Sequence, residues 1–247
     1  MFDSLERFVP DDSRPIVTEG VIRGLLDGHR VEVRFVDNLA TIVQLASVEG
    51  AGVPRVYGAG VHAGAPWFAI ECLSDLDPSS INADEFIDIF HYVVNGLSVA
   101  LGANLAHGKI SWSTIRRSDV GFVLDGWEDR VSTGPVEAIW RQDMASIASL
   151  ILSKESAPLA IKPGLRVWAK QLTLSFKDSS RLGSPHSALN ALTTILGPPS
   201  TGLPPKMITK REPHGLGLYV HRRQELYGRP AELARLEGIL ESTIKQR

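Results

Sequence analysis

The chain has 247 residues, of which 43% are hydrophobic and 22% are charged, a composition typical of a globular protein. Its net charge of −2 and pI near 6.4 argue against a nucleic-acid-binding protein, because such proteins carry a broad positive surface. The single cysteine, Cys72, excludes an intramolecular disulfide and indicates a reducing compartment. No basic start with an apolar run and no stretch of roughly 18 apolar residues is present. We therefore expect a cytoplasmic protein without a membrane or nucleic-acid partner.

Four segments in the first third of the chain predict a small β-sheet with one helix. Residues 1–18 are polar with two prolines, and we expect an irregular lead-in or a first edge strand there. In residues 29–36, H-R-V-E-V-R-F-V, apolar side chains alternate with charged ones, which is the pattern of a half-buried strand. Residues 37–48 have helical spacing, and residues 53–73 read as a strand, a turn and a second strand.

The middle of the chain predicts helices. Residues 82–106 carry apolar side chains at helical spacing, and Asn82 followed by Glu85 predicts a capping box at their start. Residues 142–153 are apolar nearly all round, as in a buried helix, and residues 187–196 predict a last helix. The expected fold class is therefore α+β.

The composition changes after the last predicted helix. Residues 198–226 begin with prolines that prevent regular structure, so we expect a proline-rich linker. Residues 227–247 predict an amphipathic helix whose opening, G-R-x-x-E-L, resembles the start of an ATPase module. This resemblance suggests the N-terminal part of a longer multidomain protein, and the alternative is that the helix packs on this chain. Four aliphatic side chains share its apolar face: Leu233, Leu236, Leu240 and Ile244.

The stretch from Leu105 to Trp127 reads L-A-H-G-K-I-S-W-S-T-I-R-R-S-D-V-G-F-V-L-D-G-W. It resembles the catalytic loop and metal-binding turn of eukaryotic-like (bacterial) serine/threonine protein kinases. The resemblance covers about residues 19–197. It implies a bilobal protein-kinase-like fold, with a small antiparallel β-sheet lobe at residues 19–73 and a larger, mainly α-helical lobe at residues 74–197.

The resemblance also implies that groups needed for phosphoryl transfer are missing. An active kinase has an Asp that accepts the substrate hydroxyl proton, a later Asn that holds magnesium, and often a Lys between them. The matching residues here are Lys109, Thr114 and Ser111, so this loop has no catalytic residue. No G-x-G-x-x-G loop precedes the strand at residues 29–36, and residues 19–26 fit an ordinary β-hairpin strand.

Candidate nucleotide-pocket residues follow from the same resemblance. Arg34 takes the place of the phosphate-pairing Lys, although a planar guanidinium does not replace an ammonium geometrically. The alternative for Arg34 is a surface arginine on an edge strand. The Glu that pairs with such a Lys would fall near Thr41. Ile70 would lie behind an adenine pocket, and the backbone from Glu71 to Leu73 would meet adenine.

Asp125, in the sequence D-G-W, takes the place of the Asp in the kinase metal-binding motif. Three roles are open to it. Its carboxylate could bind a metal–nucleotide complex, it could be a turn residue that accepts backbone hydrogen bonds, or it could pair with Lys109 and fill the position of magnesium. We expect no resident metal and no cofactor, and ATP with magnesium would bind only in the first of these roles.

Other residues match positions with a structural duty in the family. The resemblance implies that the carboxylate of Asp143 orders the backbone of the loop around His107. It also implies an ion pair between Glu137 and Arg181. The segment that leads from the D-G-W turn to Asp143 is short, which leaves little room for a platform that binds a peptide substrate.

These expectations favour a catalytically inactive pseudokinase that acts as a regulatory or scaffolding module through a protein partner. Positioning and charge neutralisation supply nearly all of phosphoryl-transfer catalysis, and the groups that provide both are altered. The alternative is a nucleotide-binding kinase-like enzyme with residual or repurposed transferase activity that uses Arg34 and Asp125. A third possibility is an α/β binding domain unrelated to kinases. The histidines have no metal-ligand spacing, and no nucleophile motif is present.

Overall fold

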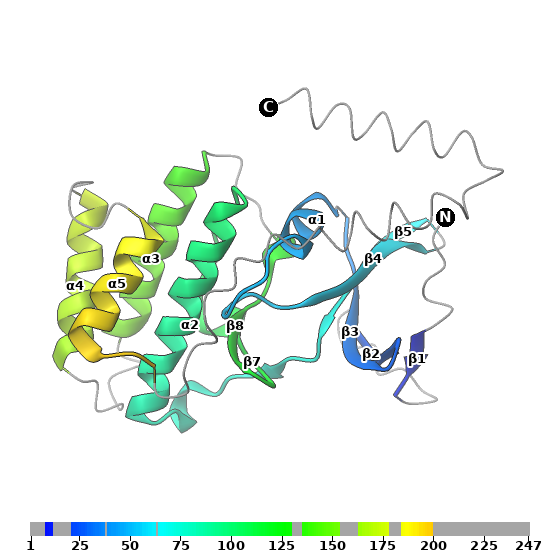
Figure 1. The fold of residues 1–247 in the computed structure, drawn as a ribbon, viewed down its shortest axis with the longest axis horizontal. Coiled ribbons are helices and arrows are strands. Elements are labelled where there is room, and N and C mark those ends of the chain that lie inside the picture. The colour runs from blue at the N-terminus through cyan, green and yellow to red at the C-terminus, as the bar shows by residue number, and fades with distance from the viewer. Residues whose placement is uncertain are drawn as a thin grey trace.

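The computed structural model describes residues 8–11, 21–37, 39–62, 64–129, 135–153, 163–177 and 184–199. These residues form an α+β protein, as the sequence predicts. A five-stranded antiparallel sheet lies on one side and the long helices lie on the other, with a three-stranded ribbon between them (Figure 1). Among the residues that the structure describes, no helix combines the length and apolar character needed to cross a membrane.

The elements follow the chain in this order, with η marking single 3₁₀ turns: β1 (Phe8–Pro10), β2 (Val21–Leu26), β3 (His29–Phe35), α1 (Ala40–Ala46), β4 (Val56–His62), β5 (Ala65–Glu71), β6 (Ser74–Asp75), η2 (Pro78–Ser80), α2 (Ala83–Gly102), η3 (Trp112–Thr114), β7 (Ile115–Ser118), β8 (Gly121–Leu124), η4 (Trp127–Asp129), α3 (Val136–Leu152), α4 (Pro163–Lys177) and α5 (Pro185–Leu196).

The five-stranded sheet has the order β1-β2-β3-β5-β4, so β3 lies at its centre. The hairpin between β2 and β3 turns at Asp27 and Gly28, whose φ angles of 51° and 83° match the turn type that fits the twist of a hairpin. The interpretation of Arg34 as a surface residue on an edge strand is therefore wrong. The two edge strands are β4 and β1, and β1 lies in the segment for which the sequence left a lead-in or an edge strand open.

Strand β3 is also buried more completely than its alternating sequence predicts. Val31 and Val33 are fully buried in a small core on one face, as expected. Glu32, on the opposite face, is only 1% exposed, whereas Phe35 at the end of the strand is 41% exposed. The prediction of one buried apolar face and one solvated charged face fails because a central strand is covered on both sides.

One continuous core joins the sheet to the helices. It extends from α1 and β5 through α2 to α3, α4 and α5. Helix α2 is the centre of this core, and its first turn is capped by Asn82, whose side chain accepts hydrogen bonds from the backbone N–H groups of Asp84 and Glu85. The carboxylate of Glu85 binds Arg117 of β7 instead of completing the predicted capping box.

The helices differ from their predicted bounds in three places. Helix α2 ends at Gly102, four residues before the predicted Ala106, and the chain turns at Asn104, which has a φ of 59°. Helix α3 begins at Val136, six residues before the predicted start at residue 142, so it includes Glu137. Helix α4 was not predicted; the indole of its Trp168 is buried and donates a hydrogen bond to a backbone carbonyl of α5.

The loop before β4 fastens the sheet to the helical part. The carbonyl of Gly52 accepts a hydrogen bond of 2.9 Å from Leu124 N, and Asn95 Nδ2 donates one of 2.7 Å to the carbonyl of Ala51. Gly52 has a φ of 90°, and a Cβ atom there would lie 1.8 Å from the carbonyl oxygen of Tyr92. Only glycine fits this approach, which sets the position of the sheet relative to α2 and β8.

Several sequence predictions lie outside the described residues. These are the position of Arg181 and therefore its pairing with Glu137, most of the linker at residues 198–226, and the amphipathic helix at residues 227–247.

Candidate functional site

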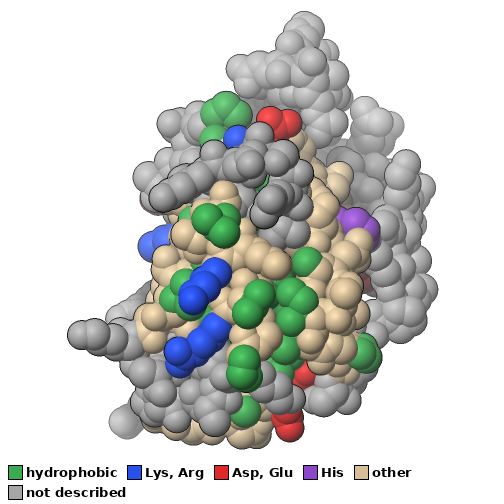
Figure 2. All heavy atoms as spheres, turned by 90° about the vertical axis from the view of Figure 1, so that its left-hand side faces the viewer, with side chains coloured by type: hydrophobic (Ala, Val, Ile, Leu, Met, Phe, Trp, Pro, Cys, Tyr) green, Lys and Arg blue, Asp and Glu red, His purple; other side chains and the backbone are tan. Residues whose placement is uncertain are grey.

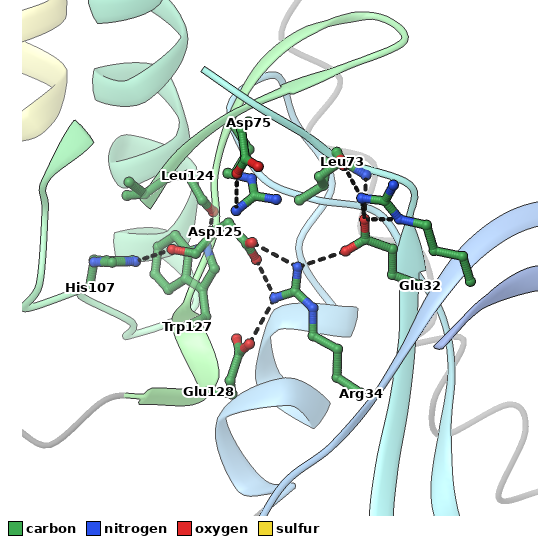
Figure 3. A network of polar contacts seen from close by, with 11 residues as sticks. Glu32, Arg34, Leu73, Asp75, His107, Leu124, Asp125, Trp127 and Glu128 are labelled. Carbon is green, nitrogen blue, oxygen red and sulfur yellow. Dashed lines mark hydrogen bonds and ion pairs between the residues drawn. The ribbon is translucent and has the colours of Figure 1, made fainter. Parts of the chain in front are cut away.

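A buried guanidinium lies where the sheet meets the ribbon and the D-G-W turn (Figure 3). Arg34 projects from β3, and its side chain is 11% exposed. Carboxylates from two separate parts of the chain surround it, Glu32 on the same strand and Asp125 and Glu128 after β8. We call these four residues the Arg34 cluster.

The strongest contact in the Arg34 cluster joins Arg34 to Asp125. Nη1 donates to Oδ1 and Nη2 donates to Oδ2, each at 2.8 Å. Two parallel hydrogen bonds between a planar guanidinium and a carboxylate give the strongest and most directional ion pair available to these groups. Both oxygens of Asp125 are therefore engaged by a cation that belongs to the chain.

The other two carboxylates bind the same guanidinium, whose buried Nε has no hydrogen-bond partner among the described residues. Arg34 Nη1 also donates to Glu128 Oε1 at 2.8 Å, and Nη2 donates to Glu32 Oε2 at 2.9 Å. Burial by itself would lower the pKa of Arg34, but the hydrogen bonds and charges of Asp125, Glu128 and Glu32 outweigh it and raise the pKa above its ordinary value. The guanidinium is therefore a permanent charge at this position.

The Arg34 cluster holds more carboxylates than cations. Burial raises the pKa of Glu128, and the charge of Arg34 opposes this shift without cancelling it. A second cation, Arg23 of β2, reaches the cluster from the solvent side and binds Glu32, with its own side chain 55% exposed. The two arginines and three carboxylates form one continuous chain of ion pairs.

Glu32 connects the two arginines. Its Oε2 accepts from Arg34, and its Oε1 accepts from Arg23 Nη2 at 2.8 Å and Arg23 Nε at 3.1 Å. The same Oε1 accepts the backbone N–H of Leu73 at 3.1 Å. Four hydrogen bonds thus compensate the burial of a carboxylate that is almost inaccessible to water.

The backbone of Leu73 is bound on both sides by this chain of ion pairs. Its N–H donates to Glu32, and its carbonyl accepts from Arg23 Nη2 at 2.9 Å. Two residues earlier, the N–H of Glu71 donates to the carbonyl of Arg55 at 3.1 Å. The segment matched to an adenine-binding backbone therefore has its N–H groups at 71 and 73 paired within the protein. Ile70, before this segment, is buried in the core.

The turn that presents Asp125 is fixed from its other side. The backbone N–H of Asp125 donates to the carbonyl of Thr114 at 2.7 Å, and its carbonyl contacts His107 Nε2 at 2.8 Å. The ring of His107 packs edge-on against Trp127, with 4.9 Å between the ring centres. Asp125 is thus a turn residue with backbone hydrogen bonds, one of the three roles that the sequence left open, and it is also a ligand of Arg34.

Asp143 orders the loop that contains His107. This carboxylate is fully buried at the start of the third turn of α3, and it accepts the backbone N–H groups of His107 at 2.9 Å and Gly108 at 2.7 Å. The structure therefore brings Asp143 and His107 together in the way that the resemblance implied.

The residues matched to the catalytic positions have a local structural role. Thr114 Oγ1 donates to the carbonyl of Ser111 at 2.9 Å and accepts the Ser111 N–H at 2.9 Å, which closes the turn η3. Lys109 shares this loop, since its carbonyl lies 3.2 Å from Thr114 Oγ1. None of these three side chains belongs to the Arg34 cluster. Glu137 is exposed in the first turn of α3, away from it.

Two members of the Arg34 cluster were not identified from the sequence. The resemblance placed the family's pairing Glu near Thr41, a position without a carboxylate, whereas Glu32 and Glu128 bind Arg34 together with Asp125. Glu32 lies two positions before Arg34, so the period of a strand already places both on one face. Glu128 follows the D-G-W turn directly, and only the fold of η4 brings it to β3. In the described part of the chain, no group of three or more His, Cys, Asp or Glu side chains is arranged to hold a metal.

Comparison with models of known protein families found no match for this chain, and a search of curated proteins found none either. The function is therefore argued from the geometry of the Arg34 cluster and its surroundings.

Proposed function

We propose that this chain is a catalytically inactive, kinase-like regulatory or scaffolding module that acts through a protein partner. The proposal takes the sheet and the helical part as the two lobes of a kinase-like fold. The main observation in support of this proposal is that Arg34 donates two hydrogen bonds to the carboxylate of Asp125. The residue in place of the metal-binding Asp is bound by the residue in place of the phosphate-pairing Lys.

The charges of the site support this proposal. A magnesium–nucleotide complex would need the oxygens of Asp125, and it would bring phosphates next to the carboxylates of Glu32 and Glu128. Like charges at such distances in a buried site repel strongly. The buried guanidinium of Arg34 is already shared among three carboxylates, so phosphate oxygens would have to displace contacts that the protein makes without a ligand.

The outer surface of the helical part supports a protein partner. Figure 2 shows hydrophobic side chains gathered on the face formed by this end of the molecule. Four large hydrophobic residues of α3, α4 and α5 are exposed: Leu152, Val167, Leu174 and Ile195. The exposed charges described on α4 are basic, those of Arg166 and Lys170. An apolar face with few charges is characteristic of a protein-binding surface.

Catalytic inactivity is tested by measuring both nucleotide binding and phosphate transfer. Thermal unfolding of the wild type is measured with magnesium alone and with millimolar ATP and magnesium, and phosphate transfer to a generic protein substrate and to water is followed in parallel. We expect no shift of the unfolding temperature and no transfer above the protein-free rate. A ligand bound at a hundred times its Kd would add about 2.7 kcal/mol to the unfolding free energy, which this assay detects easily. Saturable stabilisation with transfer would support the transferase alternative instead.

The partner is tested on the helical face. The wild type and the double variant Val167→Glu/Leu174→Glu are each used as bait in lysate of the source cells. The amounts of each protein that the two baits retain are then compared. The matched control is Val120→Glu, since Val120 is 70% exposed but lies in the turn between β7 and β8. We expect a specific partner to be lost from the double variant and kept by the control. Equal retention by all three proteins would place the partner elsewhere.

A further inference from the structure

The backbone N–H and carbonyl of Leu73 are both hydrogen-bonded to side chains of the same protein. The N–H is bound by the Glu32 carboxylate and the carbonyl by the Arg23 guanidinium, and these two side chains also bind each other at 2.8 Å. The pair thus offers Leu73 an acceptor and an adjacent donor within one planar, hydrogen-bonded unit.

The same arrangement of groups occurs at the edge of a planar aminoheterocycle. A ring nitrogen accepts a hydrogen bond, and a neighbouring amino group donates one. Such a ligand could bind the N–H of Leu73 only by displacing Glu32, and its amino group would have to compete with Arg23 for the carbonyl. Displacing Glu32 would leave its buried Oε1 without the backbone donor and would disturb its contact with Arg34, which makes the exchange costly.

We propose that the Arg23–Glu32 pair is an internal ligand for the backbone of Leu73, which closes this backbone edge to planar aminoheterocycles of the adenine type. The inference rests on the proposed function and deepens it. The Arg34–Asp125 ion pair occupies the phosphate end of the site, and the Arg23–Glu32 pair, joined to it through the contact of Glu32 with Arg34, occupies the end where a base would bind.

The arrangement of the charges indicates that the pair can be removed without loss of the fold. Replacing Glu32 by Ala leaves Arg34 bound to Asp125 and Glu128, so the buried guanidinium keeps two carboxylate partners. Arg23 is 55% exposed, and its replacement leaves Glu32 bound to Leu73 and Arg34. The two variants therefore release different groups of Leu73, the N–H in the first case and the carbonyl in the second.

The experiment uses adenosine, which lacks phosphates and so does not probe the Arg34–Asp125 end. Adenosine is titrated into the full-length wild type, Glu32→Ala, Arg23→Ala and Glu32→Gln, and binding is followed by calorimetry and by the amide resonance of Leu73. We expect no saturable binding at millimolar adenosine for the wild type and Glu32→Gln, whose amide oxygen still accepts from Leu73. Glu32→Ala should bind adenosine at least about tenfold more tightly than the wild type.

Hydrogen exchange provides a second measurement that does not depend on ligand binding. The Leu73 amide should exchange at least about tenfold faster in Glu32→Ala than in the wild type, and at an unchanged rate in Arg23→Ala. Unchanged exchange in Glu32→Ala, or adenosine binding as tight in the wild type as in that variant, would overturn the inference. A folded Glu32→Ala variant that exposes the amide but does not bind adenosine would overturn the assignment of the ligand class. If Glu32→Ala does not fold, Arg23→Ala, which frees the carbonyl of Leu73, still tests whether adenosine binds this backbone edge.

The two proposals fail in different ways. If the wild type transfers phosphate while the Leu73 amide stays protected, the proposed function is wrong and the internal ligand remains. If the wild type neither binds nor transfers, and adenosine does not bind to folded Glu32→Ala, the proposed function remains and the internal ligand is overturned.

Discussion

The guanidinium of Arg34 and the carboxylate of Asp125, which lie 91 positions apart in the chain, are joined by two parallel hydrogen bonds of 2.8 Å. One residue belongs to the central strand of the sheet and the other to the turn after β8. Their side chains are 11% and 9% exposed, so water competes little for either group. This contact fastens the sheet to the ribbon by means of groups that the protein supplies itself.

Removal of the guanidinium should strongly destabilise the protein. Arg34→Met leaves three neighbouring carboxylates buried without their shared cation, and we expect the free energy of unfolding to fall by about 3–5 kcal/mol. Arg34→Lys should lose less, because an ammonium keeps the charge but cannot form the paired hydrogen bonds. Urea denaturation at pH 7 measures both values.

The matched control for this prediction is Arg30→Met on the same strand. Arg30 pairs with Asp11, but the side chains are 73% and 37% exposed, and an exposed ion pair contributes little. Equal losses for Arg30→Met and Arg34→Met would show that the Arg34 cluster does not stabilise the fold.

Replacement of Asp143 should loosen the loop that carries His107. Asp143→Ala leaves the N–H groups of His107 and Gly108 buried without their acceptor, and we expect a loss of about 2–4 kcal/mol in unfolding free energy. Asp143→Asn retains one acceptor oxygen and should lose less. Amide exchange at Gly108 should accelerate in both variants. Asp75→Ala serves as the control, since its carboxylate is 89% exposed, and a comparable loss there would contradict this explanation.

His91 should make the stability depend on pH. It lies in α2, it is fully buried, and neither ring nitrogen makes a hydrogen bond of normal geometry with the described residues. Burial lowers the pKa of His91, although the charge of Asp88 and the backbone of Gly197 oppose the shift. Below the ordinary histidine pKa of about 6.5, the imidazole is therefore protonated in the unfolded chain but neutral in the folded protein. The free energy of unfolding is thus highest above this pH and decreases as the pH falls below it.

The variant His91→Leu should remove this pH dependence. The slope of unfolding free energy against pH that His91 contributes is at most about 1.4 kcal/mol per pH unit, and it should disappear in the variant. At pH 8 the variant should be as stable as the wild type or more stable, because two unpaired polar atoms are removed from the core. His186→Gln at an exposed position of α5 should retain the slope, since His91 remains. An unchanged slope in His91→Leu would refute the assignment.

Two glycines with the same backbone conformation should respond differently to alanine. Gly52 and Gly28 have φ angles of 90° and 83°, so both substitutions place an L-residue in the left-handed region at a cost of about 1–2 kcal/mol. A Cβ atom meets the carbonyl of Tyr92 at 1.8 Å in the first case and nothing within 4 Å in the second. Thermal unfolding should show that Gly52→Ala loses several times as much stability as Gly28→Ala. Similar losses would mean that the approach of Gly52 to α2 is not restrictive.

The local elements followed from the sequence where one physical rule dominated. The apolar spacing of α2 and the polar side chain of Asn82 before it predicted a capped, buried helix, and both features are present. The predicted strand–turn–strand at residues 53–73 corresponds to β4 and β5. These patterns are reliable because backbone periodicity and end capping depend on residues that are close together in the chain.

The burial and the partners of the charged residues could not be predicted from sequence periodicity. The pattern of β3 predicts that Glu32 and Arg34 share a face, and they do, but it assigns that face to solvent. Burial of the face depends on Leu73 and on the turn after β8, which approach it from far along the chain. Periodicity contains no information about such distant partners.

The sequence by itself determined the α+β class and most of the helices and strands. Only the tertiary structure decided what the remaining charges do. It brings Arg34 to Asp125 and Glu128, and it brings Arg23 and Glu32 to the backbone of Leu73. The physical reason is that a buried charge is stable only with partners, and those partners come from segments whose approach is set by the packing of the whole core.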